Sequence, residues 1–148
     1  MISVGKNISS IYRRLNILLT HGFKDLNIGS GQYLFLINLE EHEGINQKAL
    51  GELLNIDRAN TTRAIKKLEQ AGYVKSVVDS ADKRNKKLYL TQEGHTLIPS
   101  IRAFLFEIRL TMLVGFTEEE SNQLYFLLEK IEKNIEKGIV AIKEDANG

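Results

Sequence analysis

Basic side chains gather in the middle of this chain of 148 residues. Between Asp57 and Leu90, nine lysines and arginines stand against four acidic residues, a net charge of +5, whereas the rest of the chain carries a net charge of −4. A localised positive segment in a nearly neutral protein is typical of a surface that binds a polyanion, although a solvated charged face has the same composition. The chemistry that the sequence offers first is therefore the binding of phosphate groups.

Residues 58–71, within this segment, have the spacing of an amphipathic helix. Thr61, Ile65 and Leu68 recur at intervals of four and three, so they share one face that we expect to be buried. The opposite face is small, polar or basic and consists of Ala59, Thr62, Arg63, Lys66, Lys67 and Gln70. Such a face fits the major groove of double-stranded DNA, and a solvated basic helix surface is the alternative.

The predicted DNA-binding residues of this helix are Arg58, Asn60, Thr62, Arg63, Lys66 and Lys67. We expect Arg63 to read a base edge, because a guanidinium fork pairs with guanine in the major groove. Asn60 and Thr62 are secondary base-reading candidates. Lys66 and Lys67 are expected to contact phosphates, which sets affinity rather than sequence preference.

A second basic cluster lies between two β-branched and aromatic runs, 73–78 and 86–90, which predict an antiparallel hairpin. Its predicted DNA-binding residues are Lys83, Arg84 and Lys86. A narrow minor groove favours arginine because its potential is most negative there, so we expect Arg84 to enter one. Asp82 stands two residues earlier and is expected to orient the Arg84 guanidinium. A mobile charged hairpin tip is the alternative.

The elements that position these clusters follow from caps and apolar spacing. Residues 46–54 predict a short helix, and Asp57 and Gly72 predict the start and end of the next one, which makes a helix-turn-helix. Further helices are expected at 8–19 and 33–39 and after Thr91 and Thr117. Pro99 is expected to kink the helix after Thr91 or to delay its start. The predicted fold class is mainly α with a small β-hairpin wing, a winged helix-turn-helix.

The last predicted helix carries more apolar surface than a small domain needs. Its stripe consists of Leu124, Leu127, Leu128, Ile131, Ile135, Ile139 and Ile142. We therefore expect this face to meet a partner surface. The sequence has no internal repeat and no Pro/Gly/Ser-rich linker, which predicts one compact unit.

Other chemistries find little support in the sequence. The absence of cysteine excludes disulfides, thiolate zinc sites and thiol-based peroxide sensing. His21, His42 and His95 are far apart and lack the spacing of a helical metal site. The chain shows no nucleotide-binding or catalytic motif, no apolar run near the length of about 20 residues that spans a membrane, and no export signal at Met1–Ser10. We expect a cytoplasmic protein with no enzymatic activity, metal, cofactor or membrane.

The segment Ile45–Gly94 resembles, in order, the winged helix-turn-helix core of the MarR family (multiple antibiotic resistance regulators). Residues 82–94 are similar to the family signature D-x-R-x-x-x-L-x-L-T-x-x-G. Thr62-Arg63, Leu68-Glu69 and Gly72-Tyr73-Val74 are similar to the family's recognition helix and the turn that follows it. Thr61 departs from the pattern, because an aliphatic residue is usual there, and a small loss of stability is expected.

The resemblance covers essentially the whole chain and implies a single MarR-like domain over residues 1–148. The winged helix-turn-helix core would span about 31–94, and N- and C-terminal dimerisation helices would span about 6–22 and 95–144. The family further implies a homodimeric transcriptional repressor of a pseudo-palindromic operator, with Arg84 as a minor-groove contact and Asp82 as its orienting partner.

Relief of repression by a small phenolic or anionic effector is also implied. Arg13, Arg14 and Tyr33 lie on helices that are expected to border the effector pocket. The residues alone leave two alternatives open. One is a winged helix that binds DNA without sequence preference, and the other is a protein-interaction module.

Overall fold

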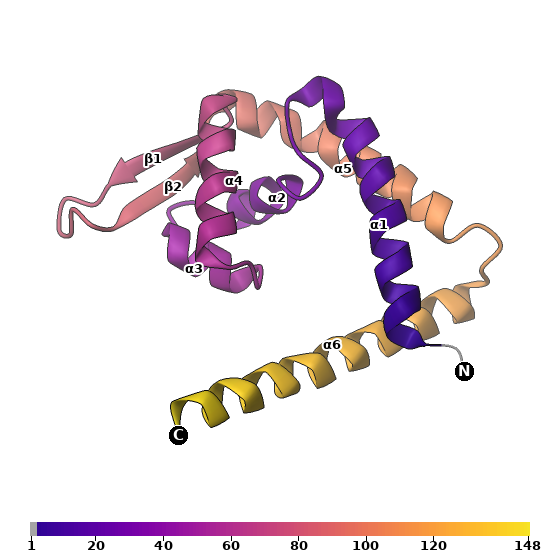
Figure 1. Ribbon diagram of the computed structural model, residues 1–148. Coiled ribbons are helices and arrows are strands. Elements are labelled where there is room, and N and C mark those ends of the chain that lie inside the picture. The colour runs from indigo at the N-terminus through magenta and orange to yellow at the C-terminus, as the bar shows by residue number, and fades with distance from the viewer. Residues whose placement is uncertain (1–2) are drawn as a thin grey trace. The chain divides into compact units, whose positions relative to one another are not determined.

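The structure is a computed structural model that describes residues 3–148; Met1 and Ile2, with which the expected domain begins, lie outside the described residues. In chain order the elements are α1 (Val4–Phe23), the 3-10 turn η1 (Lys24–Leu26), α2 (Tyr33–Glu41), α3 (Gln47–Leu53), α4 (Arg58–Gln70), β1 (Val74–Val78), β2 (Lys86–Leu90), α5 (Gln92–Met112) and α6 (Glu118–Asn147) (Figure 1). This order confirms the predicted fold class, a mainly helical chain with one hairpin wing.

Contacts within the chain divide it into two compact units, residues 1–106 and 107–148. The expectation of one compact unit over residues 1–148 differs from this division, and the single-domain organisation stays a prediction. The first unit holds most of the buried apolar side chains, whereas no residue of α6 is buried. Among the described residues, no helix has both the length and the apolar character needed to cross a membrane.

The core of the first unit lies between the helices and the hairpin. Its fully buried side chains include Phe23, Leu36, Leu39, Leu50, Ile65, Leu68, Leu88, Ile98 and Ile101. The ring of Phe23 at the end of α1 packs edge-on against Phe104 of α5, with 4.9 Å between ring centroids. A Cβ atom on Gly22 would lie 1.9 Å from the Phe104 ring, so α1 and α5 approach closely because this position has no side chain.

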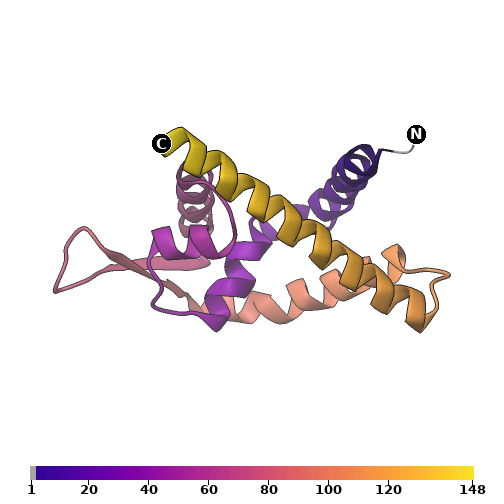
Figure 2. The same cartoon turned by 90° about the horizontal axis from the view of Figure 1, so that it is seen from below.

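The hairpin that forms the wing is antiparallel, with Val74 opposite Leu90 and Val78 opposite Lys86. A third backbone segment joins its inner edge, since Gly44 donates to the Leu88 carbonyl and Leu88 donates to the Ile45 carbonyl. Beyond this base, the hairpin extends away from α2, α3 and α4 of the same unit (Figure 2). The wing is therefore anchored at one end and free at the other.

The last part of the signature motif, T-x-x-G, joins the wing base to α5. The Thr91 hydroxyl donates to the Gly72 carbonyl at 2.6 Å and accepts from the Gly94 N–H at 3.0 Å. A Cβ atom at Gly94 would lie 2.3 Å from the main-chain oxygen of Tyr73. The motif thus supplies a hydroxyl that caps α5 and a glycine that lets α5 approach Tyr73, the residue before β1.

Thr61 is buried under α4, as its spacing predicts, and 2% of its surface is exposed. Its hydroxyl donates to the Ile56 carbonyl at 3.3 Å, so burial leaves no unsatisfied polar atom. A Cβ atom on Gly51 of α3 would stand 2.7 Å from this hydroxyl oxygen. The absence of a side chain at Gly51 therefore leaves the space that the Thr61 hydroxyl occupies. The expected small loss of stability at Thr61 stays a prediction.

Local signals place both ends of α4 and the start of α6, whereas α1 extends beyond the expected range 8–19 to Val4 and Phe23. The Asp57 carboxylate accepts from the Asn60 N–H at the start of α4, and Thr117 and Glu120 form the expected capping box at the start of α6. Gly72 has a φ of +83° just after α4, which glycine adopts without strain. Of the two alternatives expected at Pro99, the late start is wrong, because α5 begins at Gln92 and continues through the proline. The kink stays a prediction.

We predict that Gly94→Ala destabilises the protein by about 1–3 kcal/mol, since the new methyl group meets a backbone carbonyl that cannot move aside without shifting β1. Gly31→Ala is the matched control, because its Cβ atom has open space and should change stability by no more than about 0.5 kcal/mol. Urea unfolding followed by circular dichroism measures both. Equal stabilities of the two variants would contradict the close contact at Gly94.

Candidate nucleic-acid interface

The outer face of α4 is the centre of the basic surface. All six residues predicted to bind DNA on this helix are exposed, whereas Thr61, Ile65 and Leu68 on the opposite face are buried. The burial of one face fixes the rotation of the helix, because these three side chains enter the core below it. The helical spacing thus predicted correctly which side chains of α4 are buried and which are exposed. The contacts of the exposed side chains with DNA stay predictions.

Three polar side chains on this face form a chain of hydrogen bonds. The Asn60 side-chain amide donates to Asp57 Oδ2 at 2.5 Å, and Asn60 Oδ1 accepts from the Arg63 guanidinium at 2.5 Å. The other Asp57 oxygen, Oδ1, caps the helix by accepting from the Asn60 N–H at 2.9 Å. Hydrogen bonds from the main chain and then the side chain of Asn60 hold the pKa of the Asp57 carboxyl below its ordinary value.

Thr62 is also held in place, by a residue that the sequence analysis did not single out. Its hydroxyl donates to the Arg58 carbonyl at 2.9 Å and accepts from the Gln47 side-chain amide at 2.8 Å. Gln47 lies at the start of α3, fifteen residues earlier. No local pattern in the sequence marks such a pair, because it depends on how α3 and α4 pack.

The turn at the tip of the wing, residues 79–85, is shaped by short-range hydrogen bonds. Asp79 Oδ1 accepts from the Ala81 N–H at 2.9 Å, and the Asp79 N–H donates to the Asn85 carbonyl at 2.9 Å. Lys83, Arg84 and Lys86 are exposed around this turn, and Lys87 lies 4.0 Å from the Asp79 carboxylate. The tip therefore presents cations on a defined backbone.

Asp82 makes a different contact from the one expected. Its Oδ1 atom accepts from the main-chain N–H of Arg84 at 3.0 Å, and its carbonyl accepts from the Asn85 N–H at 3.0 Å. Within residues 3–148, no ion pair links the Asp82 carboxylate to the Arg84 guanidinium. Asp82 thus holds the backbone that carries Arg84, because a side chain this short closes a turn two residues on. Its expected role in orienting the Arg84 guanidinium stays a prediction.

The charges of the interface are not neutralised from within the chain. In the part of the chain that the structure describes, no carboxylate lies within ion-pair distance of Arg58, Arg63, Lys66, Lys67, Lys83, Arg84 or Lys86. The helix and the wing belong to the same unit, and α4 packs against β1 (Figure 1). Two groups of exposed cations without an ion-pair partner therefore stand on one compact unit, as a polyanion-binding surface requires.

Glu43, in the loop after α2, links the wing to α5, and the sequence did not indicate this role. Its Oε1 atom accepts from the Leu90 N–H at 2.8 Å and lies 3.1 Å from His95 Nε2 on α5. On α5, Arg102 pairs with Glu40 and Glu41 at 2.7 and 3.6 Å. His95 therefore contributes to the contact between α5 and the loop after α2. Among the described residues, no group of three or more metal-ligating side chains occurs.

A shallow hollow of about 460 Å³ lies between the α1–α2 connection and the C-terminal end of α4. It is lined by Lys24, Asn27, Ile28, Gly29, Gln32, Lys67, Gln70 and Ala71. Arg13, Arg14 and Tyr33, whose helices are expected to border the effector pocket, do not line this hollow. Arg13 and Arg14 are exposed. The Tyr33 ring packs at a tilt against Phe23 with 5.4 Å between centroids, and burial raises the pKa of its hydroxyl.

The chain is similar in sequence and in structure to known transcriptional regulators. Residues 28–86 match the MarR family. The uncharacterized HTH-type transcriptional regulator YybA of Bacillus subtilis (strain 168) is 36% identical over 144 residues, which are 97% of this chain and 96% of that protein. An uncharacterized SlyA-like transcription regulator of Listeria monocytogenes has a solved structure that is 35% identical, with a TM-score of 0.89 over 97% of this chain and 96% of that one.

A second Listeria monocytogenes structure, of a protein named as a MarR family transcriptional regulator, was solved in complex with a 26mer DNA. It is also 35% identical to this chain, with a TM-score of 0.86, and covers 97% of this chain and 96% of its own. These similarities run through the winged helix-turn-helix and through the helices before and after it. On the signature at residues 82–94, the observed fold and this extent of identity, the chain belongs to the MarR family.

Proposed function

We propose that this protein is a DNA-binding transcriptional regulator, a homodimeric repressor that binds a pseudo-palindromic operator and releases it when a small ligand binds. It has no catalytic role in this proposal and acts in the cytoplasm. In the proposed complex, α4 of each protomer enters a major groove, and the wing reaches the neighbouring minor groove. Arg63 reads a base edge, Lys66 and Lys67 contact phosphates, and Arg84 enters the minor groove.

The observation that carries this proposal is the exposed, unneutralised cationic face of α4 above a buried anchor of Thr61, Ile65 and Leu68. The helix position is fixed by the core, so its cations have one orientation relative to the wing. The relative solved with a 26mer DNA, similar over 97% of this chain, supports double-stranded DNA as the polyanion.

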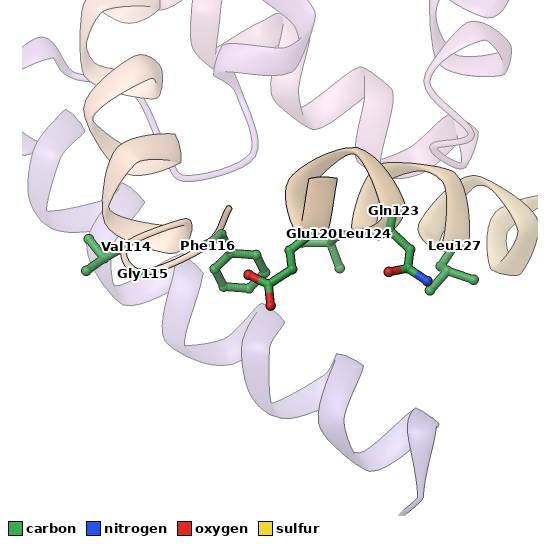
Figure 3. A pocket seen from close by; sticks show the side chains of 7 residues that line it. All are labelled: Val114, Gly115, Phe116, Glu120, Gln123, Leu124 and Leu127. Atoms are coloured by element: carbon green, nitrogen blue, oxygen red, sulfur yellow. The ribbon is translucent and has the colours of Figure 1, made fainter. Parts of the chain in front are cut away.

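A second copy of the chain is the proposed partner of the apolar surface on α6. Ile135, Ile139 and Ile142 of its stripe are 56%, 48% and 70% exposed in a single chain. The start of α6 adds an open apolar recess of about 500 Å³ that Val114, Phe116, Leu124 and Leu127 help to line. Figure 3 shows Phe116 beside Glu120, with Gln123 and Leu127 further along the helix.

The exposed apolar residues of α1, which include Ile8, Ile11, Tyr12 and Leu18, offer a second such surface. Isolated exposed apolar side chains are ordinary, but a continuous stripe over a helix of 30 residues indicates an interface. A two-fold symmetric dimer uses the same patch on both copies, and it places two recognition helices for the two halves of a pseudo-palindrome.

The proposed effector is a small phenolic or anionic compound. The hollow beside the end of α4 supports the anionic choice, because Lys24 and Lys67 come to it from two different elements. A ligand bound there would touch the recognition helix and the connection before α2 at once. Such a contact changes operator affinity only if the ligand prefers one of two arrangements of these segments.

The regulator function predicts a sequence-specific, salt-dependent complex with duplex DNA. Duplexes selected by the protein from a random library should share a two-fold symmetric motif, bound about a thousandfold or more tighter than a scrambled duplex at equal salt. Fluorescence anisotropy over a salt series measures both affinities. Equal affinity for both duplexes supports a binder without sequence preference, and no binding to either supports a protein-interaction module; each result contradicts our proposal.

The wing prediction concerns Arg84. Arg84→Ala should weaken binding by about 1–3 kcal/mol on operators with A/T-rich flanks and by less on G/C-rich flanks, because narrow A/T minor grooves attract arginine most strongly. Lys83→Ala is the control, since a phosphate contact is insensitive to flank composition. The same titrations provide the comparison. Losses for Arg84→Ala that do not depend on the flanks would exclude minor-groove insertion.

The dimer prediction uses two neighbouring aliphatic residues on α6. Ile139 and Val140 are both 48% exposed, but Val140 projects about 100° further around the helix, away from the stripe. Ile139→Glu should dissociate the dimer, because it buries an unpaired charge in the interface, whereas Val140→Glu should leave it intact. Sedimentation equilibrium reports the dimer dissociation constant. A dimer unaffected by Ile139→Glu would place the interface elsewhere.

A further inference from the structure

The hydrogen-bonded side chains Asp57, Asn60 and Arg63 form what we call the α4 relay. We propose that Asn60 is a positioning residue rather than a base reader, and that Asp57 and Asn60 together hold the Arg63 guanidinium in the orientation that reads a guanine. This inference rests on the proposed DNA-binding function and adds the group that determines its sequence preference.

The donors and acceptors of the relay permit one arrangement. A carboxylate only accepts hydrogen bonds, so the Asn60 side chain must turn its NH₂ group toward Asp57. Its carbonyl oxygen then faces away from Asp57 and accepts from Arg63, which only donates. If the Asn60 amide were reversed, it would present an oxygen to the Asp57 carboxylate and hydrogens to the guanidinium. The charges at the two ends thus fix the amide between them.

This arrangement occupies Asn60 on both sides. An asparagine reads adenine by donating from its amide nitrogen and accepting at its oxygen. In the relay each of these atoms already makes one hydrogen bond, the nitrogen to Asp57 and the oxygen to Arg63, and keeps one hydrogen and one lone pair. The plane of the Asn60 amide is therefore set by its two neighbouring side chains before any base is bound.

Arg63, in contrast, keeps enough donors for a base. A guanidinium has five N–H donors in a rigid fork, and the relay uses one of them. A bidentate contact with the O6 and N7 atoms of guanine needs two. An unrestrained arginine loses rotamer freedom when it binds, and a held one has already lost part of it, so the relay lowers the entropic cost of the contact.

Asp57 performs two tasks with its two oxygens, and they can be separated. Oδ1 caps α4, while Oδ2 holds the Asn60 amide. Serine also caps helices but has a single side-chain oxygen. Asp57→Ser should therefore keep the helix and release Asn60, which makes it a better probe of the relay than Asp57→Ala.

The first test uses the free protein and needs no DNA. In the wild type, the guanidinium of Arg63 should show slowed rotation in ¹⁵N NMR spectra, because one of its nitrogens is held by Asn60. Asn60→Ala and Asp57→Ser should both bring the Arg63 signals to those of an unrestrained arginine while thermal unfolding of Asp57→Ser stays close to that of the wild type. Arg63 signals that are the same in all three proteins would overturn the proposal, whatever the protein binds.

The second test is a double-mutant cycle on operator duplexes that the wild type selects from a random library. Arg63→Ala should cost about 5- to 150-fold in affinity and relax the preference at one guanine in each half-site. Asn60→Ala should cost about 2- to 10-fold and relax the preference at the same guanine. In the Arg63→Ala background, Asn60→Ala should cost nothing further, because its effect passes through Arg63.

Lys66→Ala supplies the control cycle, since its expected loss is equal on all sequences and should multiply with that of Asn60→Ala. An Asn60→Ala loss that persists without Arg63, or that maps to a different base pair, would make Asn60 an independent reader and overturn the proposal. If Arg63→Ala weakens all duplexes equally, the guanidinium does not read a base and the proposal fails. A wild type that selects no sequence from the library refutes the proposed function, and the NMR result then still reports whether the relay exists.

Discussion

The burial of one face of α4 is the constraint on which the rest of the interface depends. Three side chains, Thr61, Ile65 and Leu68, enter the core, Ala64 is half-buried, and the remaining positions of that helix are exposed to solvent. The helix can lie this close to α3 because Gly51 has no side chain to meet the Thr61 hydroxyl. A rotation of α4 would bury a lysine or arginine without a partner, which costs far more than the packing it would gain. The core thus decides which cations face outward.

The remaining elements of this unit fix the position of the wing relative to α4. Thr91 and Gly94 join the hairpin to α5, and Glu43 joins the hairpin to the loop after α2 and to His95. These contacts link segments that lie up to 52 residues apart in the chain. Thr91 bridges two backbone groups, and Glu43 bridges the Leu90 backbone and the His95 ring, so the base of the wing has little independent motion. Rigid placement of this kind is what recognition of a duplex requires.

The elements and caps could be predicted from the sequence because their causes are local. Asp57, Thr117 and Gly72 act within three or four residues of themselves, and the buried face of α4 follows from helical spacing alone. The contacts of Gln47 with Thr62 and of Glu43 with Leu90 could not be predicted, since they arise only after distant segments pack. The contact of Asp82 with the main-chain N–H of Arg84 was not predicted either, although a short carboxylate beside a turn commonly accepts from such a group.

The turn at the tip of the wing is held by short-range hydrogen bonds, whereas the base of the wing is held by contacts between distant segments. Its shape comes from hydrogen bonds that Asp79 and Asp82 make with backbone groups two to six residues away, and Arg84, Lys83 and Ser80 are exposed around it. Folding of the unit therefore does not depend on which side chains occupy the outer positions of the tip. Substitutions at Ser80 or Lys83 leave these hydrogen bonds in place, because the two aspartates keep the loop in shape. In the proposed complex, the side chains at the tip could therefore be exchanged to alter contacts with DNA without altering the fold of the unit.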